Sequence, residues 1–218
     1  MGETRDYSLT ESLSSAESLR FDPQSAAVMI IDLQNDFCHP DGLMSRLGQD
    51  VSSIEPAIEK LLTFLSAART ANVPLLFMRT EHSTETDSVM WLNRGSDPDR
   101  EQSCKRGSWG AEFWKVKPNE TDEVIVKNRY SAFTQEETSR TLTKLERRSL
   151  LFVGVSTGMC VESSLREAVC RDYLTTLVSD CCADYSQSAH ENALQAIGNG
   201  HGLITTSERI VHSWSITQ

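Results

Sequence analysis

The stretch from residue 150 to residue 168, LLFVGVSTGMCVESSLREA, decides the fold class of this 218-residue chain. An apolar run, residues 150–153, stops at Gly154, small and polar residues continue to Gly158, and a helical pattern opens around Cys160. The pattern predicts a buried strand, a tight turn and a helix with a cysteine in its first turn. Unpaired N–H groups and the helix dipole there would lower the pKa of the thiol and could hold an oxyanion. Cys160 is therefore a candidate nucleophile, and the alternative is a cysteine that serves only as a small core residue.

Two further apolar runs end on charged residues. Residues 26–34, AAVMIIDLQ, run into Asp32, and residues 123–127, EVIVK, end on Lys127. Such uninterrupted runs are typical of strands buried on both faces, as in a parallel sheet. A charged strand end taken alone is usually only solvated. Three parallel strands that end near Asp32, Lys127 and Cys160 would instead converge on one crevice, because open α/β sheets place their sites at the carboxyl ends of strands.

The rest of the chain alternates strand and helix patterns. The other predicted elements are strands at residues 73–78, 174–178 and 203–205 and helices at residues 54–71, 135–147, 159–171 and 188–197. This alternation predicts one α/β domain, a Rossmann-like three-layer sandwich with a six-stranded, mostly parallel sheet and helices on both faces. The domain is expected to span residues 21–218, after a partly ordered N-terminal arm of residues 1–20. Residues 81–117 form a long Trp-bearing connection, interpreted either as a pocket wall or as a surface for subunit packing.

Charge and composition exclude several classes of protein. The formal net charge of −10, without a basic stripe, argues against nucleic-acid binding. No apolar run approaches the roughly 20 residues of a membrane span. Six cysteines without an N-terminal apolar signal region favour a reducing, cytoplasmic location over a disulfide scaffold. The five histidines are scattered and no CxxC or HExxH motif is present, so neither a metal nor another cofactor is expected.

Three stretches together resemble the isochorismatase-like cysteine hydrolases. They are AAVMIIDLQNDFCHPDG from residue 26, VIVKNRYSAF from residue 124, and VGVSTGMCVESSLREAVCRDY from residue 153, the last followed by Asp180. The resemblance covers the chain from Phe21 onward. The phrase CKRGSWGAEF at residues 104–113 is similar to the amidohydrolase branch of that family, which acts on ureido and biuret-type compounds.

The resemblance implies a catalytic triad of Asp32, Lys127 and Cys160. It also implies an oxyanion hole made by the backbone N–H groups of Ser156 and Cys160, with a non-proline cis peptide bond before Ser156. Many relatives carry Asp or Asn two residues before the cysteine, where this chain has Gly158. That departure concerns a side-chain contact and leaves the nucleophile unchanged.

Candidates for the substrate-binding wall are residues that flank the triad in sequence, together with one loop tryptophan: Gln34, Asn35, Phe37, Arg129, Tyr130 and Trp91. Gln34 could instead support Asp32, and Trp91 could be a subunit anchor. Arg129, and also Arg79 near the end of the second strand, could pair a substrate carboxylate through a guanidinium fork. The alternative for both arginines is an ordinary surface ion pair.

The function hypothesis is a cysteine-dependent hydrolase that cleaves a C–N bond of a small linear amide or ureide. The substrate would be of the ureidoacrylate, biuret or N-carbamoyl type, and ammonia would leave through a covalent intermediate on Cys160. Alternatives are isochorismatase-type cleavage of a vinyl ether, which does not need the cysteine, and a non-catalytic or redox-sensing protein on the same fold. Nicotinamidase-type relatives hold a metal through an Asp and paired histidines, of which only His82 remains here, so the resemblance implies no metal. The expected partners are a small-molecule substrate and further copies of the chain, in a homodimer or homotetramer, with neither nucleic acid nor membrane.

Overall fold

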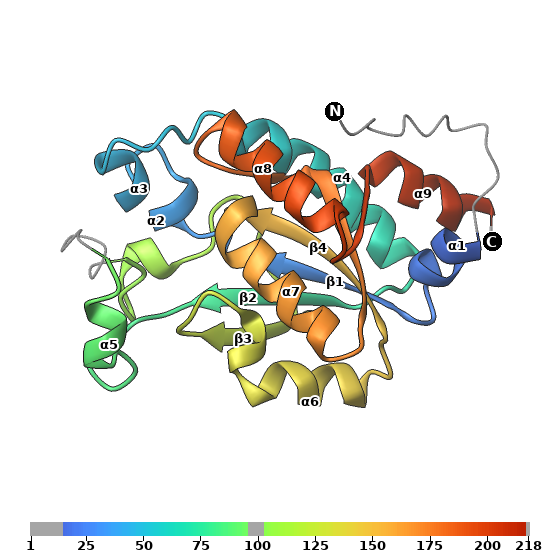
Figure 1. Ribbon diagram of the computed structural model, residues 1–218, viewed down its shortest axis with the longest axis horizontal. Helices are drawn as coiled ribbons and strands as arrows, with labels where there is room; N and C mark the ends of the chain where they lie inside the picture. The colour runs from blue at the N-terminus through green and yellow to red at the C-terminus, as the bar shows by residue number, and fades with distance from the viewer. Residues whose placement is uncertain (1–14, 96–102, 217–218) are drawn as a thin grey trace.

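A computed structural model of the protein describes residues 15–95 and 103–216. Within these ranges six strands form one sheet in the order β3-β2-β1-β4-β5-β6, and every pairing is parallel, which confirms the predicted sheet (Figure 1). The strands are β1 (Ala26–Ile31), β2 (Leu75–Thr80), β3 (Glu123–Lys127), β4 (Ser149–Val155), β5 (Leu174–Ala183) and β6 (Leu203–Thr205). The strand order reverses between β1 and β4, the point where open α/β sheets place their ligand sites.

Helices cover both faces of the sheet, as predicted for a three-layer sandwich (Figure 1). One face carries α1 (Ser15–Phe21), α4 (Ile54–Thr70) and α9 (Ser207–Ile216), and the other carries α6 (Glu136–Lys144), α7 (Glu162–Cys170) and α8 (Gln187–Gly198). The shorter helical turns are α2 (Asn35–Cys38), α3 (Leu43–Arg46), α5 (Val89–Leu92), η2 (Trp109–Ala111), η3 (Ala132–Thr134) and η4 (Thr157–Val161). In Figure 1, α2, α3 and α5 gather at the end of the sheet to which the strand arrows point. No described helix is long and apolar enough to cross a membrane.

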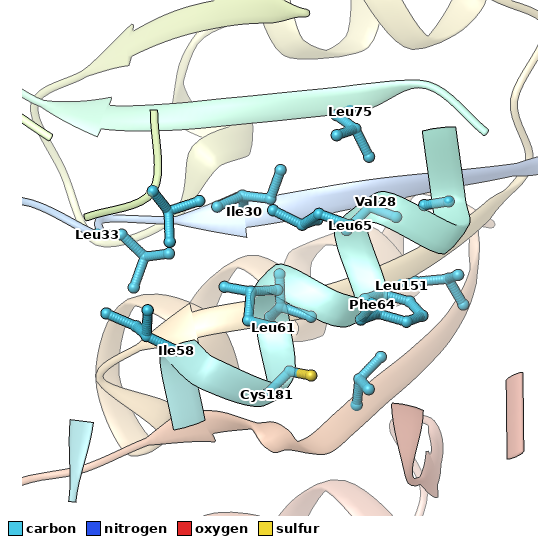
Figure 2. Close-up of a cluster of buried hydrophobic side chains, with 14 of the residues drawn as sticks. Val28, Ile30, Leu33, Ile58, Leu61, Phe64, Leu65, Leu75, Leu151 and Cys181 are labelled. Carbon is cyan, nitrogen blue, oxygen red and sulfur yellow. The ribbon is translucent and has the colours of Figure 1, made fainter. Parts of the chain in front are cut away.

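The central strands explain why the apolar runs in the sequence are uninterrupted. All residues of β1 and of β4 are buried, because helices cover both faces of these strands. Ile58, Leu61 and Leu65, spaced by three and four residues on α4, belong to the same buried cluster as Ile30 of β1 (Figure 2). Burial of each such side chain stabilises the fold by roughly 1.5–3 kcal/mol. The predicted helix at residues 54–71 is therefore the main cover of this face.

Part of the predicted N-terminal arm is helical. Residues 15–20 belong to α1, which packs on the sheet and on α9. Glu17 and Arg209 form an ion pair with both side chains buried, and the Trp214 Nε1–H group donates to the Phe21 carbonyl at 2.7 Å. The domain boundary expected at residue 21 stays a prediction. The rest of the predicted arm, residues 1–14, lies outside the described residues.

The strand before the turn that holds Cys160 (residues 156–161) lies close to β1. Gly154 of β4 has φ +117°, and a Cβ added there would lie 2.1 Å from the Ile31 carbonyl oxygen. Pairing of β4 with β5 shifts register at this point, between Phe152 and Gly154. Only glycine fits this backbone, because it lacks the Cβ that would collide with β1. The close approach sets the turn after β4 beside the end of β1.

Candidate active site

Three chain segments bring Asp32, Lys127 and Cys160 together at the carboxyl ends of the strands. Asp32 follows β1 directly and has φ +51°, and Lys127 is the last residue of β3. The Lys127 Nζ group donates to Asp32 Oδ2 at 2.7 Å, and both side chains are about 1% exposed or less. Because β2 lies between β1 and β3, the long lysine side chain spans a whole strand to reach its partner. The structure thus joins two of the three predicted triad residues by a buried ion pair.

Thr80, which the sequence analysis missed, links this ion pair to β2. Its Oγ1 accepts from Lys127 Nζ at 2.8 Å and donates to Asp32 Oδ1 at 3.0 Å. Lys127 Nζ makes a third bond to the Arg129 carbonyl at 3.0 Å. Burial lowers the pKa of Lys127, but attraction to Asp32 and Cys160 and the hydrogen bond to Asp32 together outweigh it, so the pKa lies above its ordinary value. Lys127 therefore stays protonated and fixes the orientation of the Asp32 carboxylate.

Cys160 lies in η4, a π-helical turn that precedes α7, and its thiol lines a cavity. Burial raises the pKa of Cys160; Lys127 lowers it, whereas the charge of Asp32 and a hydrogen bond to that carboxylate raise it further, so the net pKa lies above the ordinary value. The expectation that the helix end would favour a thiolate is therefore wrong for the unliganded site. The physical reason is that burial and a neighbouring carboxylate outweigh a partial dipole charge. The raised pKa favours the protonated thiol beside the Asp32 carboxylate in the unliganded site.

The turn that holds Cys160 is hydrogen-bonded to Asp184, the residue that follows β5. The Gly158 N–H group donates to Asp184 Oδ2 at 2.7 Å, and a Cβ at residue 158 would lie only 3.2 Å from that oxygen. Met159 and Val161 both donate their N–H groups to the Ser156 carbonyl. The non-proline cis peptide implied by the resemblance is present before Ser156. Asp184, another residue that the sequence analysis missed, is therefore a positioning residue for this turn.

A cavity of about 300 Å³ opens beside Cys160. Four of the predicted substrate-binding residues line it, namely Phe37, Trp91, Arg129 and Tyr130. The predicted triad residues Asp32 and Cys160 also line it, together with residues that the sequence did not indicate: His82, Arg94, Asp184 and Tyr185. The volume lies at the small end of the range for ligand pockets, which suits a small molecule. This part of the site agrees with the prediction of a small-molecule pocket at the strand ends.

Gln34, Asn35 and Arg79 lie away from the cavity wall. The Gln34 side-chain amide is fully buried, accepts from the Thr80 N–H group and donates to the Thr80 and Ala111 carbonyls, so it ties the ends of β1 and β2 together. Asn35 donates from Nδ2 to the Trp109 carbonyl at 2.8 Å. Arg79 pairs with Glu81. The Gln34 and Asn35 side chains thus bind backbone groups, and the Arg79 side chain forms an ion pair. Gln34 supports Thr80 rather than Asp32 directly.

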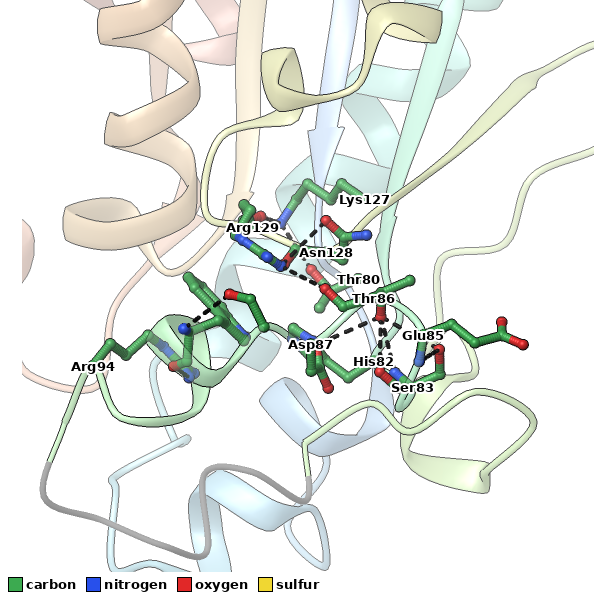
Figure 3. A network of polar contacts seen from close by, with 12 residues as sticks. Thr80, His82, Ser83, Glu85, Thr86, Asp87, Arg94, Lys127, Asn128 and Arg129 are labelled. Carbon is green, nitrogen blue, oxygen red and sulfur yellow. Dashed lines mark hydrogen bonds and ion pairs between the residues drawn. The ribbon is translucent and has the colours of Figure 1, made fainter.

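The long connection after β2 builds one wall of the cavity. Its Trp91 stacks on His82 with 5.7 Å between ring centroids and meets Tyr130 edge-on at 4.9 Å. Arg94 lies over the Trp91 ring at 3.7 Å. His82 Nδ1 is 2.7 Å from Asp87 Oδ1, and burial lowers the pKa of His82 despite that partner (Figure 3). Of the two interpretations of residues 81–117, the pocket wall is the one this arrangement supports.

The described residues contain no group of three or more His, Cys, Asp or Glu side chains that could hold a metal ion. His82 lies against Asp87 and Trp91 rather than beside further imidazoles. The absence of a metal in the function of this protein stays a prediction.

Comparison with known proteins places these features in a family. A family model described as an isochorismatase domain matches residues 26–209. The chain is 27% identical over 205 residues to the ureidoacrylate amidohydrolase RutB of Methylobacterium radiotolerans, covering 87% of this chain and 79% of that protein. The ureidoacrylate amidohydrolase RutB of Klebsiella pneumoniae is 27% identical over 217 residues, with 91% of each chain covered.

Solved structures show the same fold. A cysteine hydrolase from Pseudomonas syringae superposes with a TM-score of 0.80 at 22% identity, covering 90% of this chain and 95% of that chain. Nicotinamidase PncA from Bacillus subtilis superposes with a TM-score of 0.66 at 22% identity, covering 83% and 99%. Because the family model spans most of the sequence, from β1 into α9, the chain belongs to the isochorismatase family of hydrolases.

Proposed function

We propose that this hydrolase cleaves a C–N bond of a small linear amide or ureide and that Cys160 is the nucleophile. One observation carries the proposal: Cys160 and the Asp32 of a buried Asp32–Lys127 pair line the same small cavity. A thiol beside a fixed carboxylate is a nucleophile beside its general base. Lys127 and Thr80 hold both Asp32 oxygens, which leaves the carboxylate little freedom to turn away from the sulfur.

In the acylation step the Cys160 sulfur attacks the carbonyl carbon while Asp32 accepts the thiol proton. As the resemblance implies, the backbone N–H groups of Ser156 and Cys160 hold the oxyanion, while the neighbouring Gly158, Met159 and Val161 amides already have partners. Asp32 then returns the proton to the leaving nitrogen, and ammonia departs. This leaves a thioester or thiocarbamate on Cys160.

In the second step Asp32 takes a proton from water, which attacks the covalent intermediate and releases the acid or carbamic acid. Lys127 keeps Asp32 ionised between the two steps, because its positive charge favours the carboxylate. The names of the two ureidoacrylate amidohydrolases support the ureide class among the expected substrates. The retained Cys160 disfavours vinyl-ether cleavage, and the intact ion pair disfavours a purely redox-sensing role.

An ammonia-release assay over a panel of small substrates tests this function. We expect release from ureidoacrylate, biuret or N-carbamoyl amino acids, because each places a carbonyl carbon next to a nitrogen leaving group. Nicotinamide and isochorismate are expected to be poor substrates. Rapid turnover of nicotinamide with none of the ureides would assign the protein to another substrate class.

The homodimer or homotetramer expected from the sequence stays a prediction.

The raised pKa of Cys160 leads to a labelling prediction. At pH 7 we expect iodoacetamide to modify the exposed Cys170 before Cys160 in the substrate-free enzyme, because alkylation requires the thiolate. The rate at Cys160 should increase steadily as the pH is raised above 8, as more of the buried thiol ionises. Peptide mass spectrometry over a time course measures both rates. Preferential labelling of Cys160 at pH 7, with a rate that no longer changes with pH, would contradict the assignment of a neutral resting thiol.

A further inference from the structure

Two guanidinium groups line the cavity, those of Arg94 and Arg129. Within residues 15–95 and 103–216 neither of them forms an ion pair, although the chain holds 31 acidic and only 21 basic residues. Other arginines nearby do pair: Arg79 with Glu81, and Arg106 with Glu85 at 2.9 Å. As far as the described residues go, the two cations of the cavity wall are thus open to an anionic ligand.

Arg94 is held in a fixed orientation. Its guanidinium lies on the Trp91 ring at 3.7 Å from the centroid, a cation–π contact. Nε donates to Tyr130 Oη at 3.1 Å and Nη1 donates to the Trp91 carbonyl at 2.6 Å. Among the described residues no hydrogen bond engages Nη2. The ring and the two acceptors therefore preorganise the group and leave one edge of its fork for a ligand.

Arg129 flanks the same indole from the end of β3. Its guanidinium lies 4.8 Å from the Trp91 centroid. Its hydrogen bonds to described residues all involve Nη1, which donates to the Thr86 and Asn128 carbonyls and to Asn128 Oδ1 (Figure 3). The two positive charges thus share one aromatic ring. Their mutual repulsion is relieved when an anion binds between or beside them.

The remaining charges of the cavity do not cancel this pair. The carboxylate of Asp32 is neutralised by Lys127 at 2.7 Å. The carboxylate of Asp184 is engaged by the N–H groups of Gly158 and Tyr185. Asp87 is bonded to His82 at 2.7 Å and does not line the cavity. The Arg94 and Arg129 guanidinium groups are therefore the charged groups of the described cavity wall that remain available to an anionic group of a substrate.

We propose that Arg94, with Arg129 beside it, binds a carboxylate at the end of the substrate remote from the scissile C–N bond. The substrate class is then a small ureido acid or N-carbamoyl acid, rather than a neutral ureide such as biuret. This inference rests on the proposed function, because it takes Cys160 as the group that receives the other end of the substrate. Arg94 is the specificity-determining residue in this assignment.

Binding of matched acid and amide ligands tests the proposal without turnover. The probes are N-carbamoylglycine and N-carbamoyl-β-alanine, each compared with its neutral carboxamide, titrated calorimetrically into Cys160→Ala. We expect at least one acid to bind about 10-fold or more tightly than its amide, the range of a charge-assisted hydrogen bond. Adding Arg94→Gln should remove that preference and leave the affinity for the amide within about 2-fold. Arg106→Gln is the matched control, because this exposed arginine pairs with Glu85 outside the cavity, and it should preserve the preference.

The outcomes separate the inference from the proposed function. Equal binding of acid and amide in both pairs, absence of acid binding, or an acid preference that survives Arg94→Gln would each overturn the role of Arg94. Ammonia release by the wild-type enzyme is measured on the same four compounds. An Arg94-dependent acid preference without ammonia release from any of them would support the binding site and contradict the proposed function. Equal turnover of acids and amides would support the proposed function and contradict the carboxylate subsite.

Discussion

Replacement of Cys160 by alanine is expected to abolish ammonia release and to leave the fold intact. The thiol forms the covalent bond between enzyme and substrate in the proposed mechanism. The value of kcat/KM should therefore fall by at least about 10³-fold, equivalent to about 4 kcal/mol of barrier. The side chain is only partly buried at the edge of one core cluster, and its loss should cost on the order of 1 kcal/mol of stability. Steady-state kinetics and the thermal midpoint measure the two effects.

Cys170→Ala is the matched control for this variant, because it removes an exposed thiol from the end of α7 and should leave kcat/KM within about 2-fold. The pair of variants also separates the three functions considered for the chain. If Cys160→Ala retains full ammonia release, the assignment of the nucleophile is wrong. If both variants and the wild type cleave isochorismate equally, the vinyl-ether function is the correct one. If the wild type neither releases ammonia from any of the amides and ureides nor cleaves isochorismate, the result favours the non-catalytic or redox-sensing alternative.

The strand ends could be predicted because the signal for them is local. β1 is buried on both faces and therefore apolar throughout, so its run stops on Asp32 where the strand ends. β3 is an edge strand whose Val124 and Val126 are exposed, so the expectation that it is buried on both faces is wrong, but its apolar run also ends with the strand, on Lys127. The bounds of β3 agree with the predicted residues 123–127. β5 is longer than predicted and continues to Ala183. Its second half contains the half-buried polar pair Ser179 and Asp180, which breaks the apolar pattern without ending the strand.

The supporting residues could not be predicted because their roles depend on contacts between distant segments. In the sequence Thr80 is an ordinary strand residue. Its hydroxyl contacts Asp32 and Lys127 only because β1 and β3 flank β2 in the assembled sheet. Arg94 follows a four-residue helix too short to show a periodic pattern. The sequence predicts a substrate contact for Gln34 because this residue is close to Asp32 in the chain. The backbone there turns into α2, and the Gln34 amide binds the β2 end instead.

The direction of the pKa shift at Cys160 could not be predicted for the same reason, because it also depends on contacts between distant segments. A helix start can be read from the sequence, and it suggests a lowered thiol pKa. Burial of the sulfur and the proximity of Asp32 depend on the assembled fold, and they act in the opposite direction. In the proposed mechanism Asp32 therefore removes the thiol proton during attack, since the raised pKa favours the protonated thiol.

Lys127→Met is expected to cause the largest loss of stability of any single change at this site. The variant removes the cation from the Asp32 carboxylate, which stays buried beside the neutral Thr80 hydroxyl and Cys160 thiol. Breaking a buried pair in this way costs about 3–5 kcal/mol, since an unpaired charge stays in the interior. Lys115→Met is the matched control: the Lys115–Glu55 pair is exposed on both sides, and its loss should cost about 1 kcal/mol or less. Urea unfolding of the two variants measures the difference.

A double variant distinguishes loss of the pair from loss of packing. Asp32→Asn combined with Lys127→Met replaces both charges with neutral side chains of similar size, so it should be more stable than Lys127→Met alone. Both variants should be inactive, because Asp32 either loses its orientation or takes up the proton that it must accept from Cys160. If the double variant is as unstable as Lys127→Met, packing of the lysine stem rather than the ion pair stabilises this end of the sheet. If Lys127→Met is as stable and as active as the wild type, Lys127 neither compensates the Asp32 charge nor supports its action as a base, and the triad reduces to Cys160 and Asp32.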